Sequence, residues 1–188
     1  MTQARQTSTK ADIKAALVKL LQEKDFEAIT ISDITRTAGI NRSTFYLHYL
    51  DKLDMIDKII ADILQEIMSK LPIGQAKEKW LPSVVAVLDL VVADFDFVQS
   101  LILSRPDYIS NILRSFLLEL IDRVPELEQA LNHRPALNPE YAREVFINSN
   151  IGIILHWIRK GCKESTQEIA QMFFAWNQLP SQIEGAQS

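Results

Sequence analysis

The sequence contains little that could crosslink the chain or anchor it in a membrane. Cys162 is the single cysteine among the 188 residues, so an internal disulfide is excluded. No apolar run reaches the roughly eighteen residues of a membrane-spanning helix. The N-terminus also lacks the basic and then apolar pattern of a secretion signal. We therefore expect a soluble, cytoplasmic protein that does not bind membranes.

Residues that carry out catalysis or hold metals are sparse. The three histidines, His48, His133 and His156, lie far apart and lack the spacing of a metal site. The five glycines form no phosphate-binding loop, and there is no nucleophile elbow. We therefore expect a protein that is not an enzyme and that needs no cofactor and no metal.

Positive charge is also in short supply. The formal net charge is −4, whereas a DNA-binding protein usually carries a basic surface. Residues 1–55 hold eight Lys and Arg against seven Asp and Glu, and residues 56–188 hold twelve against seventeen. Because a net charge of +1 allows few phosphate contacts, tight binding to DNA by residues 1–55 would need two copies acting together.

The segment 29–55 has the pattern of two short helices joined by a tight turn. Thr30 precedes an apolar periodic run and is expected to cap the first helix. Gly39 is expected to end this helix, because glycine reaches the left-handed conformation at little cost. Asn41 is then expected to cap a second helix over residues 42–49. This arrangement predicts a helix-turn-helix motif.

The second of these helices leaves one face free for DNA. Its buried stripe is formed by Phe45 and Tyr49, four residues apart. A helix that projects hydrogen-bond donors from its first turn fits a major groove. We expect base contacts from Arg42, Ser43 and His48, and contact of Leu47 with a thymine methyl group. Thr30 is expected to hold a phosphate.

Several of these positions together resemble a known family. They are Thr30, the turn Ala38-Gly39-Ile40, the run Thr44-Phe45-Tyr46, Tyr49, and Lys52 followed by Leu53. Over about the first sixty residues the chain resembles the DNA-binding domain of TetR/AcrR transcriptional regulators. The resemblance implies phosphate contacts from Thr44, Tyr46 and Lys52, and pairing of two copies through C-terminal helices.

The remainder of the sequence shows helical periodicity and no strand pattern. We predict an all-α fold of about nine helices, in which residues 125–138 are a partly helical connection. Residues 1–55 are expected to form a three-helix DNA-binding domain with the helix-turn-helix, which continues into a helix over 52–70. Residues 56–188 are expected to form a helical domain for effector binding and dimerisation.

Two helices near the C-terminus have more apolar surface than one chain is expected to cover. Small and polar residues follow one side of the helix over 139–160, where Gly152 would let another backbone come close. We expect a four-helix dimer interface. Its predicted residues are Ser149, Gly152, His156, Ile169, Met172, Phe173 and Trp176. The alternative is that both helices are buried within one chain.

Aromatic residues in the second half of the chain suggest a small-molecule site. Aromatic walls with a few polar groups are typical of such sites. The predicted effector pocket consists of Trp80, Phe95, Phe97, Tyr108, Phe116, Phe146, Asn150 and Trp157. Asn148 and Asn150 need polar partners in so apolar a helix. The alternative is a filled core with no pocket.

A homodimer would carry two copies of the DNA-binding domain of residues 1–55, and this predicts how the protein functions. Two recognition helices related by a two-fold axis fit successive major grooves. We expect a transcriptional repressor that binds double-stranded DNA at a pseudo-palindromic operator as a homodimer, and that an unknown small-molecule effector releases or modulates. The alternative is a ligand-responsive co-activator or protein adaptor of the same fold with little direct base readout. The donors on residues 42–52 favour direct binding.

Overall fold

The computed structural model describes the backbone of residues 2–133 and 137–177, and the side chains of residues 9–133 and 137–177. Within these ranges the chain forms ten α-helices and two short 3-10 helices, without strands, which confirms the predicted all-α fold. The additional helix lies where we expected only a partly helical connection, after Val124. In the same ranges no helix has the length and apolar character needed to cross a bilayer.

The chain divides into two compact units that interrupt each other along the sequence. Unit 1 comprises residues 1–66 and 94–106, and unit 2 comprises residues 67–93 and 107–188. This division differs from the expected boundary after residue 55. Most of the helix over 52–70 belongs to unit 1, and so does a helix from the middle of the chain.

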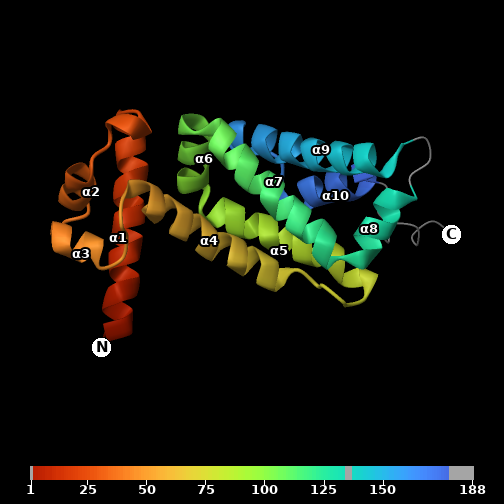
Figure 1. Ribbon diagram of the computed structural model, residues 1–188, viewed down its shortest axis with the longest axis horizontal. Helices are drawn as coiled ribbons and strands as arrows, with labels where there is room; N and C mark the ends of the chain where they lie inside the picture. Colours follow the sequence, from red (N-terminus) through yellow and green to blue (C-terminus); the bar gives the residue numbers. More distant parts are fainter. Residues whose placement is uncertain (1, 134–136, 178–188) are drawn as a thin grey trace. The chain divides into compact units, whose positions relative to one another are not determined.

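Unit 1 contains the N-terminal helices and one later helix that packs against the first. Figure 1 shows α2 and α3 together on one side of α1. The elements of unit 1 are α1 (Thr2–Glu23), η1 (Phe26–Ala28), α2 (Ile31–Thr37), α3 (Arg42–Tyr46), α4 (Lys52–Lys70, shared with unit 2) and α6 (Phe95–Ser104).

The core of unit 1 forms where apolar faces of its short helices meet. Leu17, Ile34 and Phe45 come from three different helices, and none of them retains exposed surface. The apolar side of α4 closes the same core through Met55 and Ile56, which are equally buried. Each such side chain contributes roughly 1.5–3 kcal/mol when it leaves water. Because α2 and α3 are too short to be stable alone, this burial holds them in place.

The predicted start and end of α2 are present in the structure. The Thr30 hydroxyl accepts a hydrogen bond from the Asp33 N–H at 3.1 Å, and the Asp33 carboxylate accepts one from the Thr30 N–H at 3.0 Å. Lys24 and the hydroxyl and N–H of Thr30 donate to this carboxylate, and together they hold the pKa of Asp33 well below its usual range. Gly39 has a φ of +67°, the left-handed conformation expected of the residue that ends the helix.

Unit 2 is a bundle in which α5, α7, α9 and α10 lie alongside one another (Figure 1). Its core includes Phe146, Ile151 and Leu155 of α9, while α10 packs against α5 and α8 packs against α9. The elements of unit 2 are η2 (Lys77–Lys79), α5 (Trp80–Ala93), α7 (Pro106–Arg123), α8 (Pro125–Asn132), α9 (Pro139–Arg159) and α10 (Thr166–Asn177).

Tyr49 carries a buried hydroxyl with no hydrogen-bond partner among the described residues. Burial, followed by the charges of Asp62 and Asp54, raises the pKa of Tyr49 to about 12. Because the pKa is higher in the folded state than the unfolded value of 10.0, the folded state loses stability as the pH rises from 10 toward 12. The ring is needed for the core, but the hydroxyl is a cost.

We therefore expect Tyr49→Phe to stabilise unit 1 by about 1 kcal/mol, since it removes an unpaired buried polar group. The variant should also lose less stability than the wild type between pH 10 and 12. Amide hydrogen exchange of α2 and α3 near neutral pH measures the gain in stability, because all three tryptophans lie in unit 2 and do not report on unit 1. Urea unfolding followed by circular dichroism at several pH values measures the pH dependence, because amide exchange is too fast to follow at high pH. A destabilised Tyr49→Phe protein would show that the hydroxyl has a partner.

Candidate nucleic-acid interface and small-molecule cavity

Helix α3 and the turn after it present a largely exposed surface, while one side of the helix is anchored in the core. Phe45 is fully buried, whereas the adjacent Tyr46 is 49% exposed and Leu47 is 80% exposed. Arg42 and Ser43 are exposed, and Thr44 and His48 are partly exposed. An exposed leucine next to an exposed tyrosine and arginine is unusual for a surface that contacts only water. This surface is suited to a binding partner.

The helix is shorter than predicted, because it ends at Tyr46 rather than at Tyr49. The His48 N–H donates to the Phe45 carbonyl at 3.0 Å, a three-residue step that tightens the chain into a turn. Asp51 then caps α4 by accepting hydrogen bonds from the N–H groups of Leu53 and Asp54. Leu47 and His48 therefore lie in the turn after α3 and not on the helix.

Asn41 holds the first turn of α3 through one side-chain oxygen. Its Oδ1 accepts hydrogen bonds from the Thr44 N–H at 2.7 Å, the Thr44 hydroxyl at 2.8 Å and the Ser43 hydroxyl at 2.6 Å. A hydroxyl has a single hydrogen to donate. Ser43 and Thr44 can therefore accept from a base or from water in this arrangement, but they must leave Asn41 to donate to a phosphate.

Arg42 is the cation of α3 that is best placed to reach outward. Its Nη2 lies 3.3 Å from the Tyr46 hydroxyl, and its guanidinium carbon lies 6.0 Å from the centre of the Tyr46 ring. Both side chains are exposed, so these contacts orient the guanidinium without burying it. A guanidinium held in this way can make a bidentate contact with a guanine edge.

Lys52 is placed differently from the prediction. Its ammonium donates to the carbonyls of Phe26 at 2.8 Å, Glu27 at 3.0 Å and Ile29 at 3.0 Å, and lies 4.5 Å from the centre of the Phe26 ring. An ammonium has three hydrogens, and all three are used. A phosphate contact would require Lys52 to release at least one of these carbonyls.

Thr30 is also engaged within the protein. Its hydroxyl donates to the Asp33 carboxylate at 2.8 Å in addition to capping α2. Arg36, which we did not predict as a site residue, is 77% exposed and lies on the same helix, where it donates to Asp33 at 2.7 Å. Its signal in the sequence is its position three residues after Asp33, on the polar side of α2.

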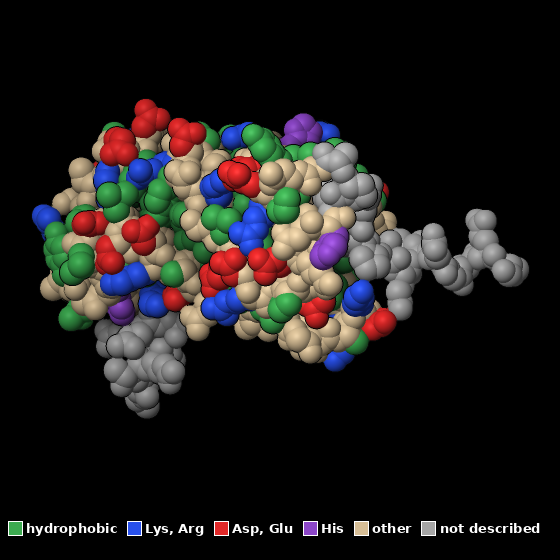
Figure 2. All heavy atoms as spheres, turned by 45° about the vertical axis from the view of Figure 1, so that its right-hand side comes forward, with side chains coloured by type: hydrophobic (Ala, Val, Ile, Leu, Met, Phe, Trp, Pro, Cys, Tyr) green, Lys and Arg blue, Asp and Glu red, His purple; other side chains and the backbone are tan. Residues whose placement is uncertain are grey.

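On the face drawn in Figure 2, the described residues form no strong basic area. Figure 2 shows Lys and Arg side chains interspersed with Asp and Glu on the visible face. Several basic residues of unit 1 are paired with acids, including Lys10 with Asp62 at 3.1 Å and Lys58 with Asp54 at 2.9 Å. Electrostatic attraction to DNA is therefore modest for one chain, and recognition depends on specific contacts.

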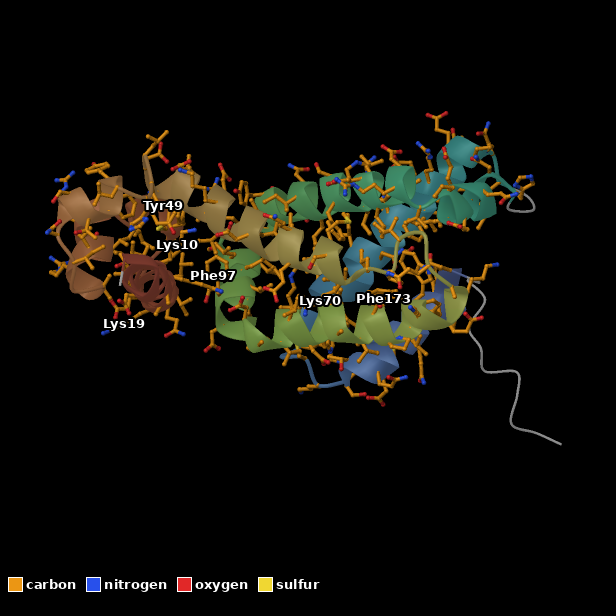
Figure 3. The ribbon with its side chains drawn as sticks, turned by 90° about the horizontal axis from the view of Figure 1, so that it is seen from below. Lys10, Lys19, Tyr49, Lys70, Phe97 and Phe173 are labelled. Carbon is orange, nitrogen blue, oxygen red and sulfur yellow. The ribbon has the colours of Figure 1, made fainter. Side chains whose placement is uncertain are left out.

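Unit 2 contains a partly open cavity of about 260 Å³ with an almost entirely apolar wall. Four of the eight residues that we predicted for an effector pocket line it, namely Trp80, Phe116, Phe146 and Asn150. Helix α5 is apolar on nearly all sides, but apart from Leu88 its residues keep partial or full exposure, and three of these, Trp80, Val84 and Val87, line the cavity. Phe173 (labelled in Figure 3) and Asn177 are lining residues of α10.

The other four predicted pocket residues lie elsewhere. Phe95 and Phe97 belong to α6 in unit 1, where Phe97 is buried beneath the ammonium of Lys14, 4.9 Å from its ring centre (Figure 3). Trp157 is buried outside the cavity, and its indole N–H donates to the Glu164 carbonyl at 2.9 Å. Tyr108 does not line the cavity either. Helical spacing identified aromatic residues that are buried or partly buried, but it did not show which of them line the cavity.

The two halves of the sequence match family descriptions. Residues 13–59 match the family described as bacterial regulatory proteins of the tetR family, and residues 78–176 match the one described as the C-terminal region of a transcriptional regulator. The second match spans more than half of the chain. The protein belongs to the TetR family of transcriptional regulators. Members of the TetR family are DNA-binding regulators and are generally not enzymes.

A curated relative of this TetR-family protein shares part of its sequence. It is YxbF of Bacillus subtilis (strain 168), an uncharacterized HTH-type transcriptional regulator, which is 39% identical over 67 residues. The matched region is 36% of this chain and 18% of the relative, so the chain spans less than a fifth of the relative's length.

Solved structures of other proteins share the fold at low sequence identity. A TetR transcriptional regulator of Streptococcus agalactiae 2603V gives a TM-score of 0.65 at 22% identity, covering 94% of this chain and 97% of that chain. The dihydroxyacetone kinase operon activator DhaS and the fatty acid degradation regulator FadR of Bacillus halodurans each give 0.63, at 18% and 17% identity. Both cover 90% of this chain and 94% of their own. At these identities the likeness shows the TetR fold alone.

The residues predicted for a dimer interface separate into two groups. Gly152, His156, Met172 and Trp176 are exposed, and Ser149 is partly exposed. Ile169 is buried within unit 2, and Phe173 lines the cavity, so the structure gives these two residues a role inside the chain. Two residues that we did not predict, Tyr141 at 65% and Val145 at 39% exposure, extend the exposed apolar side of α9.

Proposed function

We propose that the protein is a ligand-responsive DNA-binding repressor that binds a pseudo-palindromic operator as a homodimer. The observation that supports this most strongly is the exposed surface formed by α3 and the turn after it. Arg42, Tyr46 and Leu47 are exposed there, on a segment that the buried Phe45 anchors in the core. In a TetR-family helix-turn-helix this surface would enter the major groove. Arg42 would read a guanine, and Leu47 a thymine methyl group.

Selection of bound sequences from random duplex DNA tests direct recognition. We expect an inverted repeat whose two halves lie about one helical turn apart or slightly more. The same experiment tests the alternative function, a co-activator or adaptor with little direct base readout. This alternative needs a test because the donors of Ser43, Thr44 and Lys52 form hydrogen bonds within the chain. An adaptor would enrich no sequence over the starting pool. A reporter gene behind the selected operator then gives the sign of regulation, which matters because one fold neighbour is named an operon activator.

The homodimer would form through the exposed sides of α9 and α10. Gly152 is exposed, and a Cβ added there would meet no atom within 4 Å. Within one chain, replacing a mid-helix glycine should therefore stabilise α9 by roughly 0.5–1 kcal/mol. In a dimer, the same side chain would separate two closely approaching helices.

We expect Gly152→Gln to keep or raise the thermal stability of unit 2 while shifting the protein from dimer to monomer. Sedimentation velocity over a range of concentrations measures the second effect, and the tryptophan fluorescence of unit 2 follows the first. Ser115→Gln, at an exposed position of α7, is a control that should remain dimeric. A Gly152→Gln protein that dimerises as tightly as the wild type would place the interface elsewhere.

The cavity of unit 2 supports the ligand response in this proposal. An effector shifts operator affinity only by as much as it binds the two conformations differently. A bundle with a partly open apolar cavity has such a capacity, because filling the cavity would change how α5, α7 and α10 pack. We expect the affinity for the operator to fall when a ligand occupies the cavity, and measuring that affinity with and without the ligand tests this.

A further inference from the structure

Polar groups are rare in the wall of the unit 2 cavity, and they are of two kinds. Asn150 of α9 and Asn177 of α10 are 6% and 4% exposed and lie inside unit 2. Lys77 and Glu126 are exposed residues that carry opposite charges. The remaining lining residues are apolar, apart from the indole N–H of the partly exposed Trp80. The interior recognition chemistry of the cavity therefore depends on one pair of amides.

These two amides hold each other in a closed arrangement. Asn177 Nδ2 donates to Asn150 Oδ1 at 3.1 Å, and Asn150 Nδ2 donates to Asn177 Oδ1 at 3.4 Å. Each Nδ2 also donates to a backbone carbonyl one turn earlier, that of Phe146 at 2.6 Å for Asn150 and that of Phe173 at 2.8 Å for Asn177. An amide nitrogen has two hydrogens, so all four N–H groups of the pair are used within the protein.

The pair therefore offers acceptors to the cavity and no donors. The carbonyl oxygen of Asn150 receives one hydrogen bond from Asn177 and has a second lone pair. A ligand hydroxyl can donate to that lone pair without disturbing the closed pair. A carboxylate at the same place would receive no hydrogen bond from the amide pair, so the pair would not replace its lost hydration.

The charged lining residues do not change this preference. Lys77 and Glu126 are exposed, so an ion held by either side chain would lie at a solvent-facing part of the wall, unlike a group held by the buried amides. A neutral ligand also loses the least hydration when it enters an apolar wall.

Building on the proposed function, we propose that the cavity binds an electrically neutral, largely apolar molecule that carries a hydroxyl group, and that this hydroxyl donates a hydrogen bond to Oδ1 of Asn150. Asn177 acts as the positioning residue, because its N–H groups fix the orientation of the Asn150 amide. The ligand class is thus an aliphatic alcohol rather than a fatty acid or an amine.

Titration of the full chain with 1-octanol and with octanoate at pH 7.5 compares two probes that share a chain of eight carbons. Isothermal calorimetry gives the affinity and the stoichiometry, and tryptophan fluorescence reports on the cavity, since Trp80 lines it. We expect saturable binding of one 1-octanol per chain, at least about tenfold tighter than octanoate. Equal affinity, tighter octanoate binding or non-saturable binding of 1-octanol would overturn the proposal.

A double substitution tests the role of the amides. Asn150→Leu together with Asn177→Leu removes both members of the pair at once, so neither amide is left facing a leucine, and we expect the variant to fold. We expect the double variant to bind 1-octanol about tenfold more weakly and to lose its preference over 1-methoxyheptane, which cannot donate. Asn148→Leu is the matched control, because Asn148 is exposed on the same helix and does not line the cavity. An unchanged preference in the double variant would refute the assignment.

This experiment is independent of DNA recognition. If the selected operator is bound but 1-octanol is not, the ligand inference fails and the DNA-binding part of the proposed function stands. If 1-octanol binds through the amides but no DNA sequence is enriched, the reverse holds. Alcohol binding that leaves operator affinity unchanged would confirm the site and remove its regulatory role.

Discussion

Arg42→Ala is expected to reduce the affinity for the selected operator by about 2–6 kcal/mol, because one bidentate base contact is worth roughly 1–3 kcal/mol and the homodimer makes it twice. This corresponds to a loss of at least about 30-fold. Binding to scrambled DNA should change much less, since a base contact adds little to non-specific affinity. Fluorescence anisotropy with both duplexes at one salt concentration measures the difference.

The structure supplies the controls for this experiment. Arg42 contacts only the exposed Tyr46 in the described part of the chain, so its loss should change the free energy of unfolding by no more than about 0.5 kcal/mol. Arg123→Ala removes the same charge from an exposed residue of α7 that pairs with Glu119. It should leave operator binding unchanged. Equal losses on the operator and on scrambled DNA for Arg42→Ala would assign Arg42 to the phosphate backbone.

Lys52→Met is expected to destabilise unit 1 by about 2–4 kcal/mol, because hydrogen bonds to a charged group are the stronger ones and three are lost at once. Methionine retains much of the aliphatic stem, so the change isolates the ammonium. The carbonyls of Phe26, Glu27 and Ile29 would then lack their common donor, and the connection between η1 and α2 would loosen. Amide exchange of α2 measures this destabilisation.

Lys58→Met is the matched control on the same helix. Its side chain is half exposed, and its ammonium pairs with Asp54 at 2.9 Å and donates to one carbonyl, that of His48, at 3.2 Å, so we expect its loss to cost less than the loss of the three carbonyl contacts of Lys52. The resemblance to the TetR/AcrR family predicts a different result for Lys52, a phosphate contact whose loss lowers the slope of log affinity against log salt by about one. Normal stability with a reduced salt slope in Lys52→Met would support that role over the one inferred from the carbonyls.

Local signals in the sequence were sufficient to predict where α2 begins and ends and where α3 begins. The Thr30 cap, the Gly39 turn and the Asn41 cap each depend on residues within four positions of one another, so neighbouring side chains decide them. The length of α3 was not predictable in the same way. Its last turn is replaced by a tight bend because the chain must enter α4, whose apolar face is bound to the core of unit 1.

The cavity was only partly predictable. Trp80, Phe116, Phe146 and Asn150 were chosen as aromatic or amide residues on apolar helices, and they line it. Phe97 met the same criteria, but it belongs to unit 1, because α6 packs against α1 from far along the sequence. Asn177 was missed, since nothing near it in the sequence indicates that it pairs with an amide 27 residues earlier.

The sequence by itself determined the helical class, the helix-turn-helix and the outward position of Arg42, because periodicity, caps and turns act over a few residues. Only the tertiary structure decided that Lys52 binds three carbonyls, that α6 joins the N-terminal unit, and that two asparagines present oxygens to an apolar space. Those outcomes depend on which distant groups meet when helices pack. Tertiary packing decides which groups form a hydrogen bond and which side chains line a cavity, because the type of a residue does not specify its partner.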